Sequence, residues 1–285
     1  MTNQVKKLNR VDKAILVPTD FSVVAENAVV HALEFARRLH YRVCLLHVQG
    51  IIPGTIYNKE EEANQNSRRD LLQCKEKWEQ KYAVKIDPLI REGNLFKVVN
   101  KVAAEVSPAM MVMGTHGKQG LQHLFGSHAL RVVLDAACPV LIVQERLFGE
   151  GYRRVLLPVT GELEPRCLIR WALLFNKLFN SEIHLFQALE KNPERNHLLA
   201  GITLQMTRVF QEQKTACTIN TAATINDFSN QVIAYAIENR ADMIMTTTLP
   251  EPDASGVSFS TWNERLMFNP AQVPVMFIDQ ENASA

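Results

Sequence analysis

The chain has 285 residues, of which 47% are hydrophobic and 21% charged, and its formal net charge is +1. This is the composition of an ordinary globular protein of one or two domains, and so small a net charge favours neither nucleic acid nor an anionic membrane as a partner. No run approaches the roughly 20 apolar residues that a membrane span needs. We therefore expect no nucleic-acid partner and no membrane partner.

The five cysteines are scattered along the chain and form no CxxC pair: Cys44, Cys74, Cys138, Cys167 and Cys217. An odd number without regular spacing is typical of reduced thiols rather than of a disulfide framework. Residues 1–12 are polar and contain no apolar segment of the kind found in signal peptides. Together these features predict a cytoplasmic protein.

Strands and helices are expected to alternate through the first half. The predicted strands are 14–17, 43–48, 84–90, 109–112 and 140–143. The predicted helices are 22–39, 59–81, 95–106 and 127–137, and Ser22 is placed to cap the first of them. Such alternation indicates βαβ units and a parallel sheet.

The same order of elements returns after about 140 residues. Strands are predicted at 154–160, 182–186, 217–223, 242–246 and 273–278, and helices at 165–179, 193–213 and 227–239, the last with Asp227 as a plausible cap. Each repeat would be an α/β domain, a five-stranded parallel sheet with helices on both faces. We therefore predict two tandem Rossmann-like domains, 1–148 and 149–285.

A loop rich in glycine follows the strand predicted at 109–112. It contains Gly114, Gly117, Gly120 and Gly126, and it ends at Ser127, where the next helix is expected to begin. Glycines let a phosphate approach the backbone, and the first N–H groups of a helix point at such an anion. A simple strand-to-helix turn would need fewer glycines, so this pattern favours an anion site.

Asp20 follows the first predicted strand. If the strands at 14–17 and 109–112 are neighbours, Asp20 and the glycine loop flank one crevice at the carboxyl ends of the strands. The alternative is that Asp20 only caps the helix that follows. The two roles do not exclude each other.

The corresponding segments of the second half are chemically different. Where the first half has Pro18-Thr19-Asp20, the second has Pro158-Val159-Thr160, without a carboxylate. The segment 246–256 contains prolines, which remove N–H donors, and carboxylates, which repel phosphate. We therefore expect one anion site per chain, in the first half, and a degenerate loop over 246–270 whose apolar residues pack against the protein's own fold.

Three stretches together resemble the universal stress protein family: Val17-Pro18-Thr19-Asp20-Phe21-Ser22, then Gly114-Thr115-His116-Gly117 with Gly126-Ser127, and Cys138-Pro139 with the strand at 140–143. The resemblance implies the fold of the adenine nucleotide alpha hydrolases and binding of ATP or another adenine nucleotide, with or without Mg²⁺. It also implies that the strands at 140–143 and 275–278 pair within the chain as a pseudo-dimer. Whether two chains associate further, as a homodimer, is left open.

The resemblance also assigns residues to the nucleotide site. Asp20 would contact the nucleoside; Pro18, Thr19 and Val48 would line the adenine and ribose; Met113, Gly114, His116 and Gly117 would lie along the ribose and phosphates; and Gly126, Ser127 and His128 would receive the phosphate chain. Between Gly117 and Gly126 the chain has eight residues, one fewer than the family pattern usually has. The shorter spacing tightens the loop.

The sequence contains no recognisable catalytic set. His116, His123 and His128 are spaced by seven and five residues, which matches no zinc motif, and no nucleophile is accompanied by a base and an orienting group. Any hydrolysis of ATP would therefore be slow. Two alternatives remain beside a nucleotide-binding stress-response protein: a nucleotide-free interaction module of the same fold, and an enzyme of the adenine-nucleotide α-hydrolase group.

Overall fold

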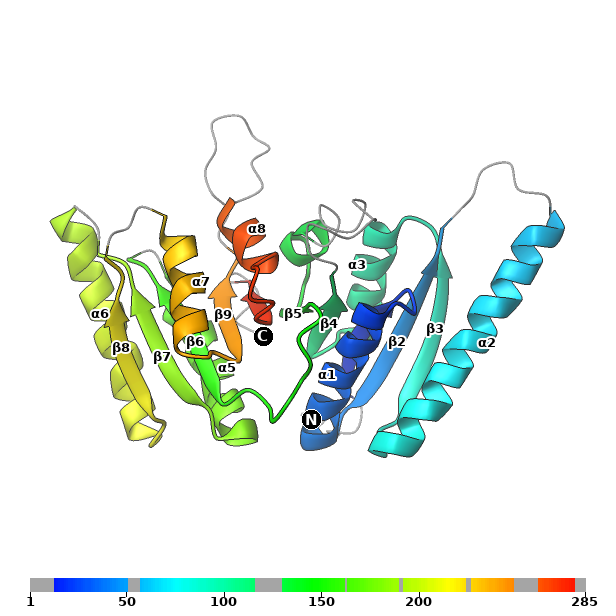
Figure 1. Ribbon diagram of the computed structural model, residues 1–285, viewed down its shortest axis with the longest axis horizontal. Coiled ribbons are helices and arrows are strands. Elements are labelled where there is room, and N and C mark those ends of the chain that lie inside the picture. The colour runs from blue at the N-terminus through cyan, green and yellow to red at the C-terminus, as the bar shows by residue number, and fades with distance from the viewer. Residues whose placement is uncertain are drawn as a thin grey trace, which may run out of the picture. The chain divides into compact units, whose positions relative to one another are not determined.

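The computed structural model describes residues 13–50, 57–115, 130–161, 163–189, 192–223, 227–248 and 261–279. The chain divides into two compact units, residues 1–114 and 115–285 (Figure 1). Strands alternate with helices in both units, so the predicted α/β class is confirmed.

The first unit contains a parallel sheet whose described strands run in the order β3-β2-β1-β4. Its elements are β1 (Ala14–Thr19), α1 (Val23–Leu39), β2 (Arg42–Gln49), α2 (Tyr57–Tyr82), β3 (Ile86–Glu92), α3 (Leu95–Val106) and β4 (Met110–Gly114). Every residue of β1 is buried, as expected for an apolar strand covered on both faces. The predicted adjacency of the first and fourth strands is confirmed, because Ile15 of β1 pairs with Met110 of β4.

Helix α1 lies close to this sheet because small side chains form its inner stripe. Ala28, Ala32 and Ala36 recur every four residues and are fully buried. Ser22 caps the helix as predicted, since its hydroxyl accepts a hydrogen bond from the Ala25 N–H at 3.2 Å. The start of α1 is thereby held directly after the end of β1.

The second unit contains a sheet in the order β5-β10-β9-β6-β7-β8. Its strands are β5 (Val140–Val143), β6 (Arg154–Val159), β7 (Glu182–Gln187), β8 (Cys217–Thr221), β9 (Met243–Thr247) and β10 (Val275–Ile278), and its helices include α5 (Pro165–Phe179), α6 (Pro193–Glu212), α7 (Phe228–Glu238) and α8 (Thr261–Met267). The pairing predicted between the two fifth strands is confirmed, because β10 runs antiparallel to β5 with Val275 beside Ile142. The other pairs in this sheet, β10–β9, β9–β6, β6–β7 and β7–β8, are parallel.

The structure corrects the sequence prediction at two linked places. Helix α8 lies within the segment predicted to be a loop, and its residues Leu266 and Met267 are fully buried. Asp227 occupies the N-cap position of α7, as predicted, but it has left-handed backbone dihedrals (φ 58°) and its side chain makes no capping hydrogen bond. Its carboxylate instead pairs with Arg265 of α8 at 2.9 Å. The role of Asp227 could not be predicted without α8.

Candidate functional site

The described part of the predicted site lies at the carboxyl ends of β1 and β4. β1 ends at Thr19 and β4 at Gly114, and the two strands are parallel neighbours. Parallel neighbours end at the same edge of a sheet, and the strand order reverses between these two. Asp20 and the beginning of the glycine loop therefore follow adjacent strands at the edge where ligands of such sheets usually bind.

The predicted site residues differ in their exposure. Pro18, Thr19 and Met113 are buried within their strands, Val48 and Gly114 are half-buried at strand ends, and Asp20 is exposed. The remaining predicted residues, His116, Gly117, Gly126, Ser127 and His128, lie outside the described residues. The structure thus brings Asp20 and Gly114 to one edge, and the proposed phosphate donors stay predictions.

Asp20 is not the cap of α1. Its Oδ1 accepts a hydrogen bond from the Ser22 N–H at 3.0 Å, while Ser22 itself caps the helix. The alternative considered from the sequence, that Asp20 caps α1, is therefore wrong. Asp20 instead orders the turn before the helix. Within the described part of the chain Oδ2 has no hydrogen bond, so the exposed carboxylate keeps an acceptor for a ligand.

His47 braces this turn, although the sequence gave no reason to select it. The Nδ1–H of His47 donates to the Thr19 carbonyl oxygen at 2.9 Å, and its ring lies 4.6 Å from the ring of Phe21, centroid to centroid. Phe21 has a positive φ of 62°, which is costly for a bulky residue, and its N–H donates to Thr19 Oγ1 at 3.1 Å. These contacts hold the backbone on both sides of Asp20.

The strand ends of the second half have different residues at the corresponding positions. Val155 of β6 pairs with Met243 of β9, just as Ile15 pairs with Met110. By this register Thr160 corresponds to Asp20 and Thr247 to Gly114. The second half therefore has neither the carboxylate nor the first glycine of the site.

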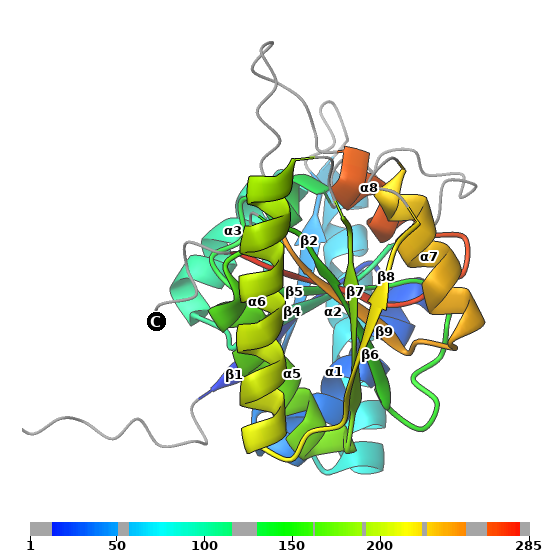
Figure 2. The same cartoon turned by 90° about the vertical axis from the view of Figure 1, so that its left-hand side faces the viewer.

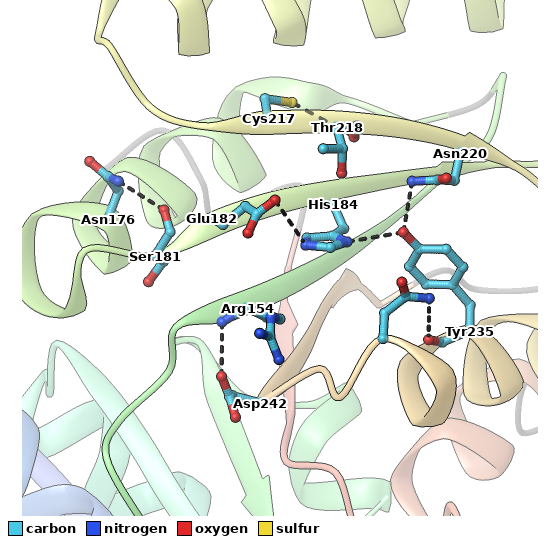
Figure 3. Close-up of polar contacts among 11 residues, drawn as sticks. Arg154, Asn176, Ser181, Glu182, His184, Cys217, Thr218, Asn220, Tyr235 and Asp242 are labelled. Atoms are coloured by element: carbon cyan, nitrogen blue, oxygen red, sulfur yellow. Dashed lines mark hydrogen bonds and ion pairs between the residues drawn. The ribbon is translucent and has the colours of Figure 1, made fainter.

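The clearest polar cluster of the second unit joins β7, β8 and α7 (Figure 3). The Tyr235 hydroxyl lies 3.0 Å from His184 Nδ1, and it accepts a hydrogen bond from Asn220 Nδ2 at 2.7 Å. With Tyr235 donating to Nδ1, the His184 proton lies on Nε2, which is 3.5 Å from a carboxylate oxygen of Glu182.

The electrostatics of this cluster oppose a catalytic role. Burial lowers the pKa of His184, although the nearby Glu182 carboxylate raises it. Burial, together with the Glu182 charge, raises the pKa of Tyr235. Both rings are thus stabilised in their neutral forms, and the phenol is not activated as a nucleophile. We interpret the cluster as a link between β7, β8 and α7.

A separate hollow of about 420 Å³ lies in the first unit beside α2 and the ends of β2 and β3. It is lined by Gln49, Arg68, Leu71, Leu72, Pro88, Ile90 and Glu92. Of the predicted site residues that the structure describes, none lines it. Among the described residues, no group of three or more His, Cys, Asp or Glu side chains is arranged to hold a metal ion. None of the described helices is both long and apolar enough to cross a membrane.

Comparison with known proteins gives one consistent result. The model of the Universal stress protein family matches residues 13–144. Universal stress protein MJ0531 of Methanocaldococcus jannaschii is 31% identical over 140 residues, which cover 47% of this chain and 82% of that protein. A universal stress protein structure from Archaeoglobus fulgidus DSM 4304 matches 95% of this chain and 98% of its own with a TM-score of 0.75 and 16% identity. Another Archaeoglobus fulgidus structure, in complex with dAMP, matches 46% of this chain and 96% of its own with a TM-score of 0.36 and 23% identity.

Proposed function

The chain belongs to the universal stress protein family, and we propose that its first half binds ATP or a related adenine nucleotide in a stress-response or regulatory role. The bound nucleotide would lie at the carboxyl ends of β1 and β4. The second half would act as a structural or regulatory partner without a nucleotide of its own.

The observation that carries this proposal is the position of Asp20. Its carboxylate is exposed at the edge where the strand order reverses, it follows the strand next to Gly114, and one of its oxygens has no hydrogen bond among the described residues. A carboxylate at this edge suits the hydroxyl groups of a ribose, which it can accept hydrogen bonds from. His47 and Ser22 hold the turn that presents it.

A second observation concerns Thr115, the residue after Gly114. Its side chain is buried, with 1% of its surface exposed, and its hydroxyl oxygen has no hydrogen-bond partner in the described structure. A buried hydroxyl without a partner costs about 1–3 kcal/mol. A ligand oxygen or a bound water beside the glycine loop would remove that cost. Where Mg²⁺ accompanies ATP, phosphate oxygens and water would supply most of its ligands.

The difference between the two halves supports a single site per chain. Thr160 and Thr247 stand where the first half has Asp20 and Gly114, as the strand register requires. The second half nevertheless supplies β10, which pairs with β5. Its contribution would therefore be structural.

A nucleotide-free interaction module is the second candidate, and the eight-residue spacing between Gly117 and Gly126 favours it. Calorimetric titration of ATP and AMP into the full chain and into an Asp20→Asn variant separates the two. Saturable binding that Asp20→Asn weakens supports the nucleotide site. If the unsubstituted chain binds neither ATP nor AMP, the nucleotide-free interaction module is the remaining candidate.

A further inference from the structure

β8 is the terminal strand of the sheet in the second unit. It pairs with β7, and no other described strand lies along its outer edge. Figure 2 looks onto this edge: β8 lies between α6 on one side and α7 on the other, and neither helix crosses in front of it. The two helices cover the faces of the strand rather than its edge.

The pairing with β7 determines which backbone groups of β8 are left without a strand partner. The Ile183 N–H donates to the Ala216 carbonyl, and the Ala222 N–H donates to the Gln187 carbonyl, both at 2.8 Å. In a parallel ladder, alternate residues bond to the same neighbour, so the even-numbered residues of this segment bond to β7. The residues that turn their N–H and C=O groups outward are Cys217, Ile219 and Thr221.

The terminal strand of the first unit, β3, is protected against edge pairing. The Val43 N–H donates to the Lys85 carbonyl at 2.9 Å and the Gly93 N–H to the Gln49 carbonyl at 3.0 Å, so the odd-numbered residues of β3 face β2. Pro88 therefore lies at an outward position, where it offers no N–H to another strand. Proline at such a position is a common means of blocking edge pairing.

β8 has no such protection against edge pairing. Its sequence, Cys-Thr-Ile-Asn-Thr, contains no proline and no charge, and three of its residues are of types that favour strands. Ile219, at the centre, is 47% exposed although it is apolar. An uncharged edge of this kind is a template for a further strand.

We propose that β8 pairs antiparallel with β8 of a second copy of this chain, about a two-fold axis at Ile219. The edge is complementary to itself: Ile219 of one copy would face Ile219 of the other, and Cys217 would face Thr221. In this register the outward residues of both strands lie at hydrogen-bonded positions, so all their N–H and C=O groups obtain partners. Two identical uncharged strands meet without repulsion, and the paired Ile219 side chains cover each other.

Sedimentation of the full chain at about 50 µM tests the pairing. The unsubstituted chain is expected at twice its 32.3 kDa mass. Ile219→Lys places two like charges opposite each other and is expected to reduce the mass to that of one chain. Ile237→Lys is the matched control, because Ile237 is 53% exposed on α7 and is not part of β8, and this variant should keep the doubled mass. Circular dichroism verifies that both variants fold. A single-chain mass for the unsubstituted protein, or a doubled mass for Ile219→Lys, would overturn the proposal.

Amide hydrogen exchange followed by NMR locates the contact. The amides of Cys217, Ile219 and Thr221 should exchange more slowly as the protein is concentrated from about 1 µM to about 100 µM. Those of Thr218 and Asn220 donate to β7 and should be protected at both concentrations. A dimer in which the three outward amides exchange at the same rate at both concentrations would use another surface and would contradict the proposal.

Discussion

The backbone of Gly114 packs against the backbone of Val24. A Cβ built on Gly114 would lie 2.6 Å from the Val24 carbonyl oxygen and 3.0 Å from the Ala25 nitrogen. The end of β4 can approach the first turn of α1 this closely only because Gly114 has no side chain. Gly114 thus has a structural role in addition to the ligand contact that we propose for it.

Gly114→Ala should destabilise the protein. The new methyl group meets backbone atoms, which cannot rotate away, so α1 or β4 must shift at a cost of about 1–3 kcal/mol. The measurement is thermal unfolding followed by circular dichroism. The control is Gly201→Ala in α6, where an added Cβ would have no neighbour within 4 Å and should stabilise the helix by about 0.5–1 kcal/mol. Equal unfolding midpoints for Gly114→Ala and Gly201→Ala would show that the close approach of Gly114 to Val24 does not limit the residue at position 114.

His47→Ala should loosen the turn that presents Asp20. The substitution removes the hydrogen bond to the Thr19 carbonyl and the contact with the Phe21 ring. A loss of about 1–2 kcal/mol in stability is expected. Affinity for ATP should fall severalfold, because Asp20 would no longer be held in place. Calorimetry measures the affinity, and His197→Ala, at an exposed position of α6, is the control. Unchanged affinity in His47→Ala would refute the bracing role.

The stability of the protein should depend on His184 as the pH falls. Burial lowers the pKa of His184 in the folded state, so the unfolded chain binds the proton more readily. The contribution of the neutral ring is present above the ordinary histidine pKa of about 6.5 and is lost as the pH falls through the lowered value. Urea unfolding at pH 7.5 and 5.5 should therefore show a smaller pH effect in His184→Gln than in the unsubstituted chain. Equal pH effects would contradict this assignment.

Two of the thiols should react slowly in the folded protein. Burial raises the pKa of Cys44 and of Cys217 from 9.0 to about 11. The thiolate is the reactive form, so at pH 8 each should be alkylated about a hundredfold more slowly than a thiol with the unshifted pKa. Timed treatment with iodoacetamide and peptide mass spectrometry measures the rates, with the urea-unfolded chain as the reference. Similar alkylation rates in the folded and the urea-unfolded chain would show that burial does not protect these two thiols.

Local sequence patterns were sufficient to predict most of the fold. The bounds of α3 and α5 follow from helical periodicity and from capping residues such as Asn94 and Glu164, and they match the prediction closely. Helix α8 was missed because it has fewer than eight residues and lies next to prolines and acidic residues typical of a loop. In so short a segment, local helix propensity is a weak guide. The burial of Leu266 and Met267 against the rest of the fold stabilises the helix instead.

The candidate site could be predicted only in part. The sequence indicated Asp20 and Gly114, because the strand pattern predicted that they follow neighbouring strands. It could not indicate the bond from His47 to Thr19 or the approach of Gly114 to Val24, since each joins residues far apart in the chain. Both depend on how closely the elements pack, which a pattern of apolar positions does not specify.

Nucleotide affinity shows most directly whether the first half of the chain holds a nucleotide beside Asp20. ATP and AMP are titrated by calorimetry into the unsubstituted chain, into Asp20→Asn and into Asp70→Asn. Asp70 lies on α2, outside the site, and contacts only Arg69 through its carboxylate in the described structure. We expect one nucleotide per chain and a loss of about tenfold or more in affinity for Asp20→Asn, because a hydrogen bond to a charged group contributes about 1.5–3 kcal/mol. Asp70→Asn should bind as the unsubstituted chain does. No saturable binding to the unsubstituted chain, or equal affinity in all three proteins, would contradict a nucleotide site at Asp20.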